Sequence, residues 1–254
     1  MKNIFNIKDR VALITGATGA LGNTFARSLA EHGARVILNG RNKEKLDKEV
    51  LKLKDEGLNV YSYSFDVTNS TQVNSAIERV EQEVGPVEIL VNNAGINLRA
   101  PLDEFSEDDW NAVISTNLTG AYIVAKAVVK SMIKKNSGKI INIGSVQCEL
   151  GRPTIAPYAA SKGGLKMLTK GMATDWAKHN IQVNGIGPGY FKTELTKPLY
   201  ENPEFDSWLC GRTPSNRWGE PEELIGALLF LSSPASSYTN GQMIYVDGGL
   251  LASV

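Results

Sequence analysis

Short apolar runs alternate along the chain with longer segments in which apolar residues recur every three or four positions. Runs such as VALIT and EILV show no alternation of apolar with polar residues. That pattern is typical of strands covered on both faces, as in a parallel sheet between two helical layers. Seven such runs predict strands at 10–15, 35–38, 60–64, 88–91, 139–143, 181–186 and 243–246.

The longer segments have the spacing of amphipathic helices. They predict helices at about 20–32, 43–56, 70–84, 110–135, 158–178 and 221–231. Since parallel strands are joined by right-handed crossovers, we expect an α/β fold, a Rossmann-type doubly wound sheet of about seven parallel strands with helices on both faces. No repeat or linker divides the chain, so we expect one domain over 1–254.

The least regular segment is 187–219, which is rich in Pro, Trp and Thr. A loop of that length inside a compact domain is usually functional. We therefore expect it to form a lid over a substrate site.

Composition excludes several classes of protein. Lys plus Arg and Asp plus Glu both count 27, so the formal net charge is zero, which argues against a nucleic-acid partner. No segment reads as a signal peptide or as the roughly 18 apolar residues of a membrane span. Cys148 and Cys210 form no metal-ligand cluster and are expected to be free thiols. We therefore expect a cytoplasmic protein without a metal centre.

A glycine-rich turn joins the first predicted strand to the first predicted helix. Gly16, Gly19 and Gly22 recur at every third position there. Glycines in such a turn let the backbone approach a pyrophosphate, and the helix N-terminus offers free N–H groups. This placement predicts a dinucleotide-binding turn.

The end of the second strand indicates which dinucleotide. An acid at that place hydrogen-bonds the ribose 2′-hydroxyl of NAD, whereas an arginine accommodates a 2′-phosphate. The sequence there is Asn39-Gly40-Arg41-Asn42, with no acid. Because a guanidinium pairs well with phosphate, we predict NADP(H) in preference to NAD(H).

Candidate catalytic residues lie on the predicted helix at 158–178 and on the loop before it. Tyr158 and Lys162 are one helical turn apart on the same face. A phenol has a pKa of about 10, and a nearby cation favours its ionised form. Ser145, after the fifth strand, is placed to hydrogen-bond a substrate oxygen. Together they suggest proton transfer to an oxygen while a cofactor moves hydride at carbon.

With these residues in view, the chain resembles the classical short-chain dehydrogenases/reductases along nearly its whole length. The resemblance rests on the glycine turn, Asn92-Asn93-Ala94-Gly95, Asn117, Ser145, Tyr158, Lys162 and Pro188-Gly189. It implies that Tyr158 is the general acid/base, that Lys162 lowers the pKa of Tyr158 and holds the nicotinamide ribose, and that Ser145 orients the substrate. Asn117 would kink its helix and hold a water in the proton relay.

The same resemblance implies a set of cofactor-binding residues. Asp66 and Val67 would contact adenine, and Thr193 the carboxamide or phosphates. The full set is Gly16, Thr18, Gly19, Leu21, Arg41, Asp66, Val67, Asn93, Ala94, Gly95, Tyr158, Lys162, Pro188, Gly189 and Thr193. The chain departs from the family pattern at Ala20, where the second glycine of the classical turn is expected. We expect a slightly shifted pyrophosphate there.

The segments Ser145-Val146-Gln147-Cys148-Glu149-Leu150-Gly151-Arg152 and 179–194 resemble those of bacterial gluconate 5-dehydrogenases. That family interconverts D-gluconate and 5-keto-D-gluconate and prefers NADP(H). A sugar acid needs a cation for its carboxylate and polar groups for its hydroxyls. We predict that Arg99 binds the carboxylate and that Gln147 and Glu149 bind hydroxyls, beside Ser145 and Tyr158.

Two alternatives remain open. A 3-oxoacyl-carrier-protein reductase, or another sugar-acid dehydrogenase, would share the catalytic residues. A non-catalytic nucleotide-binding sensor would keep the fold without turnover, but such proteins can lose the Tyr or the Lys, and both are present here. The resemblance also implies a homotetramer whose partner is a small-molecule sugar acid.

Overall fold

A computed structural model describes residues 3–253 and contains one parallel sheet of seven strands. Their order across the sheet is β3-β2-β1-β4-β5-β6-β7, so the direction of winding reverses between β1 and β4. This confirms the predicted doubly wound fold. The strands are β1 Val11–Ile14, β2 Arg35–Gly40, β3 Val60–Ser64, β4 Ile89–Asn92, β5 Gly138–Ile143, β6 Ile181–Pro188 and β7 Met243–Val246.

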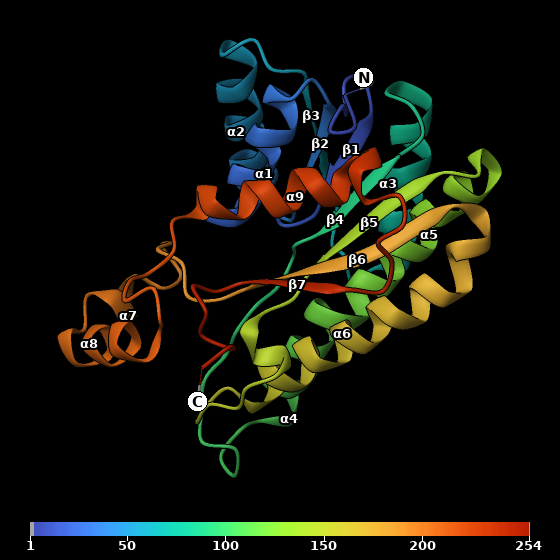
Figure 1. Ribbon diagram of the computed structural model, residues 1–254. Coiled ribbons are helices and arrows are strands. Elements are labelled where there is room, and N and C mark those ends of the chain that lie inside the picture. Colours follow the sequence, from blue (N-terminus) through green and yellow to red (C-terminus); the bar gives the residue numbers. More distant parts are fainter. Residues whose placement is uncertain (1–2, 254) are drawn as a thin grey trace.

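Helices cover both faces of the sheet (Figure 1). One layer consists of α1 Ala20–Glu31, α2 Lys43–Asp55 and α9 Ile225–Ser232. The other consists of α3 Ser70–Glu83, α4 Glu107–Ile114, α5 Gly120–Lys135 and α6 Ala156–Trp176. Two short helices, α7 Lys197–Tyr200 and α8 Pro203–Arg212, project from the body of the molecule.

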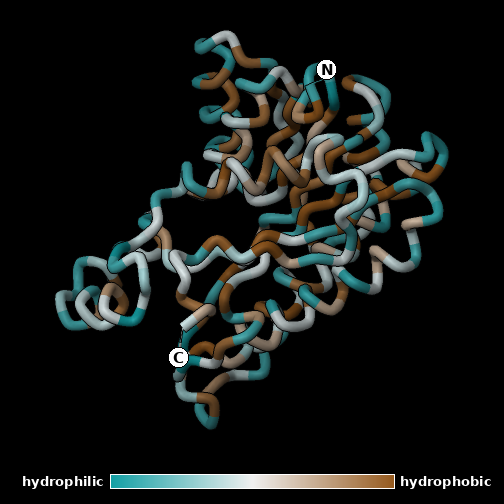
Figure 2. The backbone as a smooth tube through the Cα atoms, in the orientation of Figure 1, coloured by the Kyte–Doolittle hydropathy of each residue, from teal (hydrophilic) through white to brown (hydrophobic). Residues whose placement is uncertain are grey.

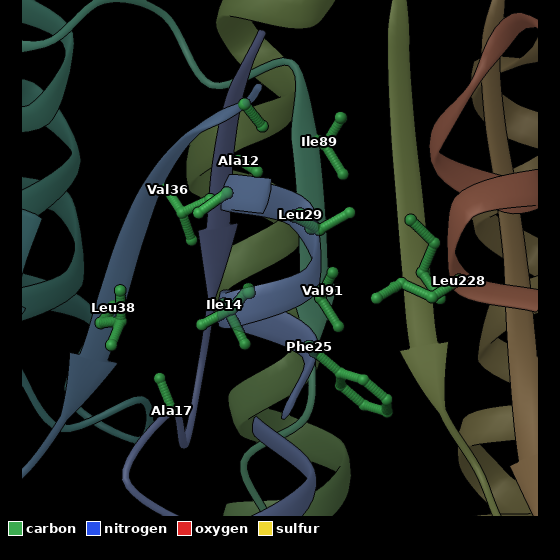
Figure 3. Packing of buried hydrophobic residues seen from close by; sticks show 14 of the residues in the cluster. Ala12, Ile14, Ala17, Phe25, Leu29, Val36, Leu38, Ile89, Val91 and Leu228 are labelled. Atoms are coloured by element: carbon green, nitrogen blue, oxygen red, sulfur yellow. The ribbon is translucent and has the colours of Figure 1, made fainter. Parts of the chain in front are cut away.

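The first strand explains why the apolar runs are uninterrupted. Val11 and Leu13 belong to the core under α3, α5 and α6, while Ala12 and Ile14 belong to the core under α1 and α9. Figure 3 shows the second of these cores, where the α1 side chains lie over β1 and its neighbours. Since β1 buries both of its faces, each of its four positions is apolar.

The predicted helix at 110–135 is broken in the structure. Between α4 and α5 lies a π-helical turn, Ser115–Thr119, which contains Asn117. By length and composition alone, the continuous helical run Glu107–Lys135 is apolar enough to cross a membrane, which differs from the expectation that no segment qualifies. Half of its apolar window is buried inside the protein, and α5 packs on β4, β5 and α3, so its hydrophobicity serves the core.

The predicted lid at 187–219 contains more regular structure than its sequence suggested, namely the end of β6 and helices α7 and α8. Backbone hydrogen bonds join the two ends of this segment. Phe191 and Gly219 form an isolated bridge, in which Lys192 N donates to Gly219 O (2.9 Å) and Gly219 N donates to Tyr190 O (2.9 Å). Figure 2 shows that the projecting α7–α8 segment mixes polar and apolar residues, unlike the apolar strands of the sheet.

Candidate active site

The predicted functional residues come together at the carboxyl edge of the sheet, around the place where the winding reverses. In doubly wound folds the crevice at this place binds the ligand. Loops after β1, β4, β5 and β6 supply the side chains, and α6 supplies two more.

The glycine-rich turn fits a dinucleotide. Gly16 has φ +64°, which favours glycine, and a Cβ there would lie 2.8 Å from Ala94 Cα. A Cβ on Gly22 would collide with the carbonyl oxygen of Gly16. Helix α1 begins after Gly19 with no side-chain cap and no acid in its first turn. Its N-terminal N–H groups and positive dipole end are therefore available to a pyrophosphate.

Asn93 holds the loop after β4 against the glycine turn. Its amide donates to Thr15 O (3.0 Å) and to Gly16 O (3.1 Å), while Thr15 Oγ1 accepts from Asn93 N and Ala94 N. The side chain predicted to line the cofactor groove is thus engaged in shaping the turn. Gly95 follows, and a Cβ there would lie 3.7 Å from Lys162 Nζ. The backbone at Gly95 therefore passes close to Lys162, which is predicted to be catalytic.

The adenine end is built by β2 and the loop after β3. Asp66 accepts from Thr68 N (2.9 Å) and Thr68 Oγ1 (2.7 Å); burial raises the pKa of Asp66, but these hydrogen bonds outweigh it and lower the pKa. Arg41 is exposed at the end of β2, and no carboxylate of residues 3–253 lies within ion-pair distance of it. A Cβ on Gly40 would lie 3.2 Å from the Thr18 side chain, so glycine leaves room there.

Helix α6 places Tyr158 and Lys162 one turn apart, as predicted. Lys162 is buried, donates to Ile143 O (2.7 Å) and lies with Nζ 5.6 Å from the centre of the Tyr158 ring. Ser145 Oγ accepts from Gln147 N (3.1 Å). The Ser145 hydroxyl is also close enough to Tyr158 to favour its ionised form. The three groups therefore surround one point at the edge of the sheet.

The pKa values of this pair differ from the expectation that the lysine acidifies the phenol. Burial raises the pKa of Tyr158 to about 12, with Ser145 opposing the shift. Burial lowers the pKa of Lys162 to about 8. Lys162 is still mostly protonated at pH 7, but burial has the larger effect on the pKa of the phenol. A further positive charge nearby would favour the phenolate.

Asn117 lies in the π-helical turn and connects three segments. Its amide donates to Ile96 O (2.9 Å) and Ser161 Oγ (3.0 Å), and its oxygen accepts from Ile96 N (2.8 Å). The irregular helix expected at Asn117 is present. Its side chain is fully engaged by the protein, so a role in holding water remains a prediction.

The predicted substrate residues have different environments. Gln147 is buried, and its Oε1 has no hydrogen-bond partner. Glu149 is exposed and accepts from Lys166 and Tyr245. The Glu149 carboxylate is thus bound within the protein, and its role in binding a substrate hydroxyl stays a prediction. Gln147 keeps an unused acceptor of the kind that a substrate hydroxyl needs.

Two residues that the sequence analysis did not select lie at the same site. Tyr190, directly after Pro188-Gly189, is close enough to influence the pKa of Tyr158 and that of Arg99. Arg152 Nη1 lies 3.4 Å from the Tyr190 hydroxyl. The pKa of Arg99 is lowered, first by burial and second by the charge of Arg152. Both residues belong to the segments that resemble gluconate 5-dehydrogenases, 145–152 and 179–194, and that resemblance was the available signal.

The loop after β6 carries the remaining predicted cofactor residues. A Cβ on Gly189 would lie 2.7 Å from Asp247 Cα, so glycine is required for the close approach of the β6 and β7 ends. Thr193 is held by Thr196, whose Oγ1 accepts from Thr193 N (2.9 Å) and donates to Phe191 O (2.6 Å). These contacts fix the base of the lid beside the catalytic residues.

Known proteins resemble this chain over its whole length. Residues 10–204 match the sequence family described as short chain dehydrogenase. The chain is 51% identical to a gluconate 5-dehydrogenase of Gluconobacter oxydans, covering 99% of this chain and 98% of that one. It is 49% identical to a 5-keto-D-gluconate 5-reductase of Escherichia coli over 100% of both chains. A solved gluconate 5-dehydrogenase from Burkholderia cenocepacia, in complex with NADP and tartrate, has a TM-score of 0.96 and 52% identity over 99% of this chain and 98% of that one.

Proposed function

Because this chain belongs to the short chain dehydrogenase family and is an oxidoreductase acting on a CH–OH group, we propose that it interconverts D-gluconate and 5-keto-D-gluconate with NADP(H). The observation that carries the proposal is the grouping of Ser145, Tyr158 and Lys162 beside the glycine turn. Relatives named for this reaction are 51% and 49% identical to the chain over nearly its whole length, which supports the choice of substrate.

Tyr158 exchanges the proton of the reacting hydroxyl. In the oxidation, the substrate O–H proton passes to the Tyr158 oxygen, the C–H hydrogen leaves with its electron pair, and the C–O bond becomes a carbonyl. When bound, the nicotinamide cofactor accepts that hydride and, in its oxidised form, adds the positive charge that the phenolate requires. In the reduction the neutral phenol returns the proton, for which a raised pKa is suitable. Ser145 orients the substrate oxygen.

Arg41 is proposed to select NADP(H) by pairing with the 2′-phosphate. The exposed guanidinium without a carboxylate partner and the absence of an acid after β2 support this. Replacing it by Arg41→Ser should raise KM for NADP about 10- to 100-fold and leave KM for NAD within about twofold. Lys43→Ser, which removes a nearby cation already paired with Asp47, is the control. Equal changes for both cofactors would refute the assignment.

The substrate is proposed to lie with its carboxylate on Arg99 and a hydroxyl on Gln147 Oε1. Arg99→Ala should raise KM for gluconate far more than KM for NADP. Unchanged gluconate kinetics would remove Arg99 from the site.

The deciding experiment is NADPH oxidation with 5-keto-D-gluconate, with Tyr158→Phe as the control. We expect turnover in the wild type and a loss of about 10³-fold in the variant. An acetoacetyl thioester serves as the second substrate. Preference for the thioester would favour the acyl-carrier-protein reductase alternative, and cofactor binding without any turnover would favour the sensor.

We further propose that one domain carries all of this chemistry, that 187–219 is its lid, and that the enzyme is a cytoplasmic homotetramer. Large apolar side chains exposed on α5 and α6, Tyr122 and Met167, support contact with other copies of the chain. Light scattering coupled to size exclusion tests the subunit number.

A further inference from the structure

Two arginines stand on neighbouring loops at the proposed substrate end: the exposed Arg99 and the half-buried Arg152, whose charge contributes to lowering the pKa of Arg99. Arg99 follows β4, and Arg152 precedes α6. The two loops are joined by Ala100 N, which donates to Thr154 O (3.2 Å). Within residues 3–253, neither arginine has a carboxylate within ion-pair distance. Two like charges held side by side without a counterion are unfavourable unless a ligand supplies the negative charge.

Other arginines of the chain are bound differently. Each of them hydrogen-bonds or ion-pairs with a carboxylate, a main-chain carbonyl or a serine. They are Arg10, Arg27, Arg35, Arg79, Arg212 and Arg217, and the one further arginine, Arg41, is the exposed residue proposed to bind the 2′-phosphate. Within residues 3–253, Arg152 has one polar contact, the 3.4 Å approach to the Tyr190 hydroxyl, so most of its five N–H donors remain unused.

The orientation of Arg152 is set by aromatic side chains of the lid. Its Cζ lies 4.6 Å from the centre of the Phe205 ring, within the range of a cation–π contact. Phe205 belongs to α8 and packs with Tyr190, ring centre to ring centre, at 5.9 Å. Trp218 completes the cluster, 5.7 Å from Tyr190 and 6.3 Å from Phe205. The guanidinium therefore bridges the loop before α6 and the lid.

Tyr190 connects this arginine to the reacting end of the site. It is close enough to Tyr158 to influence the pKa of the catalytic phenol, and it contacts Arg152 directly. Gln147, whose backbone N–H donates to Ser145 Oγ, adds a buried Oε1 that has no hydrogen-bond partner within residues 3–253 and can accept from a hydroxyl. The site thus offers proton transfer and a hydroxyl acceptor at one end, and positive charge at the other.

We propose that Arg152 is a second anion-binding residue, which binds the substrate carboxylate together with Arg99 and is held in place by Phe205 of the lid. The proposal rests on the proposed function and deepens it. It assigns the substrate class as polyhydroxy acids whose carboxylate is remote from the reacting CH–OH. It also makes lid position and carboxylate binding interdependent, because Arg152 contacts both.

Calorimetry on the NADP-bound Tyr158→Phe protein tests this without turnover. Gluconate and tartrate are the probes. Arg152→Gln should weaken the binding of both about 10- to 100-fold, the effect of losing charge-assisted hydrogen bonds to a carboxylate. Arg152→Lys should restore it only in part, since an ammonium neither stacks nor pairs bidentately as a guanidinium does. Lys197→Gln, which removes an exposed lysine on α7, should leave both dissociation constants unchanged.

The lid contact has a test of its own. Phe205→Leu should weaken gluconate binding about 3- to 10-fold, because the stacked orientation is lost while both charges remain. NADP binding and the melting temperature should stay within error in the Arg152 variants. If Arg152→Gln binds gluconate and tartrate as tightly as its parent, the proposal is wrong. If it loses NADP affinity and stability to the same degree, Arg152 is a structural residue and the proposal is equally wrong.

The outcome also separates this inference from the proposed function. Tartrate binding that depends on Arg152, in a protein that neither binds nor oxidises gluconate, would support the anion site and reject gluconate as substrate. If Arg152→Gln leaves gluconate turnover unchanged and Arg99→Ala abolishes it, the proposed function is supported and the role of Arg152 in anion binding is refuted.

Discussion

A buried lysine lies at each end of strand β5: Lys139 of the strand itself at the amino end, and Lys162 of α6 at the carboxyl end. The surroundings of the two lysines differ. At the amino end, Lys139 donates to Ser236 Oγ (3.0 Å), and Arg10 beside it pairs with Glu88. At the carboxyl end, Lys162 donates to Ile143 O. Burial lowers the pKa of both lysines to about 8, and Arg10 adds to the effect at Lys139.

The difference lies in what surrounds each charge. Around Lys139, Arg10 donates to the carbonyls of Ser232 and Glu88, and the Ser236 hydroxyl donates to that of Leu231, although Ser232 Oγ has no hydrogen-bond partner within residues 3–253. At the carboxyl edge, within the same residues, Gln147 Oε1 has no hydrogen-bond partner, and neither Arg99 nor Arg152 has a carboxylate within ion-pair distance. The cation Arg10 at the amino edge is thus paired within the chain, whereas the two arginines at the carboxyl edge are not, and this contrast supports the placement of the proposed site.

The largest expected effect comes from exchanging the two lysines for methionine. Lys162→Met should lower kcat/KM by about 10²–10³-fold, or about 3–4 kcal/mol, because the cation beside the reacting phenol is lost. Lys139→Met should leave kcat/KM within about threefold, since it lies at the other edge of the sheet. Steady-state kinetics on both variants measures the ratio. Comparable losses would mean that the two edges are not functionally distinct.

An intermediate effect is expected in the pH dependence of stability. An unfolded lysine has a pKa of about 10.4, so between pH 8 and 10 the unfolded chain binds more protons than the folded one, and stability rises with pH. The contribution of Lys139 is about 3 kcal/mol over that range. In Lys139→Met this contribution is absent, so the stability of the variant relative to wild type should fall by about that amount from pH 7 to 10. Urea unfolding measures it, and parallel curves would contradict a lowered pKa at Lys139.

The smallest expected effect contrasts two buried glutamines. Gln147 has an unpartnered oxygen at the carboxyl edge, whereas Gln182 on β6 donates to Asn180 Oδ1 (3.3 Å) toward the amino edge. Gln147→Leu should stabilise the fold by about 1 kcal/mol and raise KM for gluconate. Gln182→Leu should destabilise by about 1 kcal/mol and leave KM unchanged. The comparison fails if both substitutions destabilise equally in thermal unfolding.

Much of the site could be predicted from spacing along the chain. The Tyr158–Lys162 pair and the glycine turn depend on short-range geometry, one helical turn and one strand-to-helix connection, which the sequence states directly. The role given to Glu149 stays a prediction, and its partners Lys166 and Tyr245 could not be read from its nearness to Ser145 in the sequence. Arg152 was not selected from the sequence because its contacts are with Tyr190 and Phe205, which lie 38 and more residues away along the chain.

The sequence by itself determined the alternating strands and helices, the order in which they wind, and the edge at which the chemistry occurs, because each follows from local periodicity and the handedness of crossovers. Only the tertiary structure decided which charges are neutralised within the chain and which are left for a ligand. Contacts between segments that are distant in sequence set that distinction. In the weakly polar interior, the presence or absence of a partner determines the pKa of a charged side chain and whether it is free to bind a ligand.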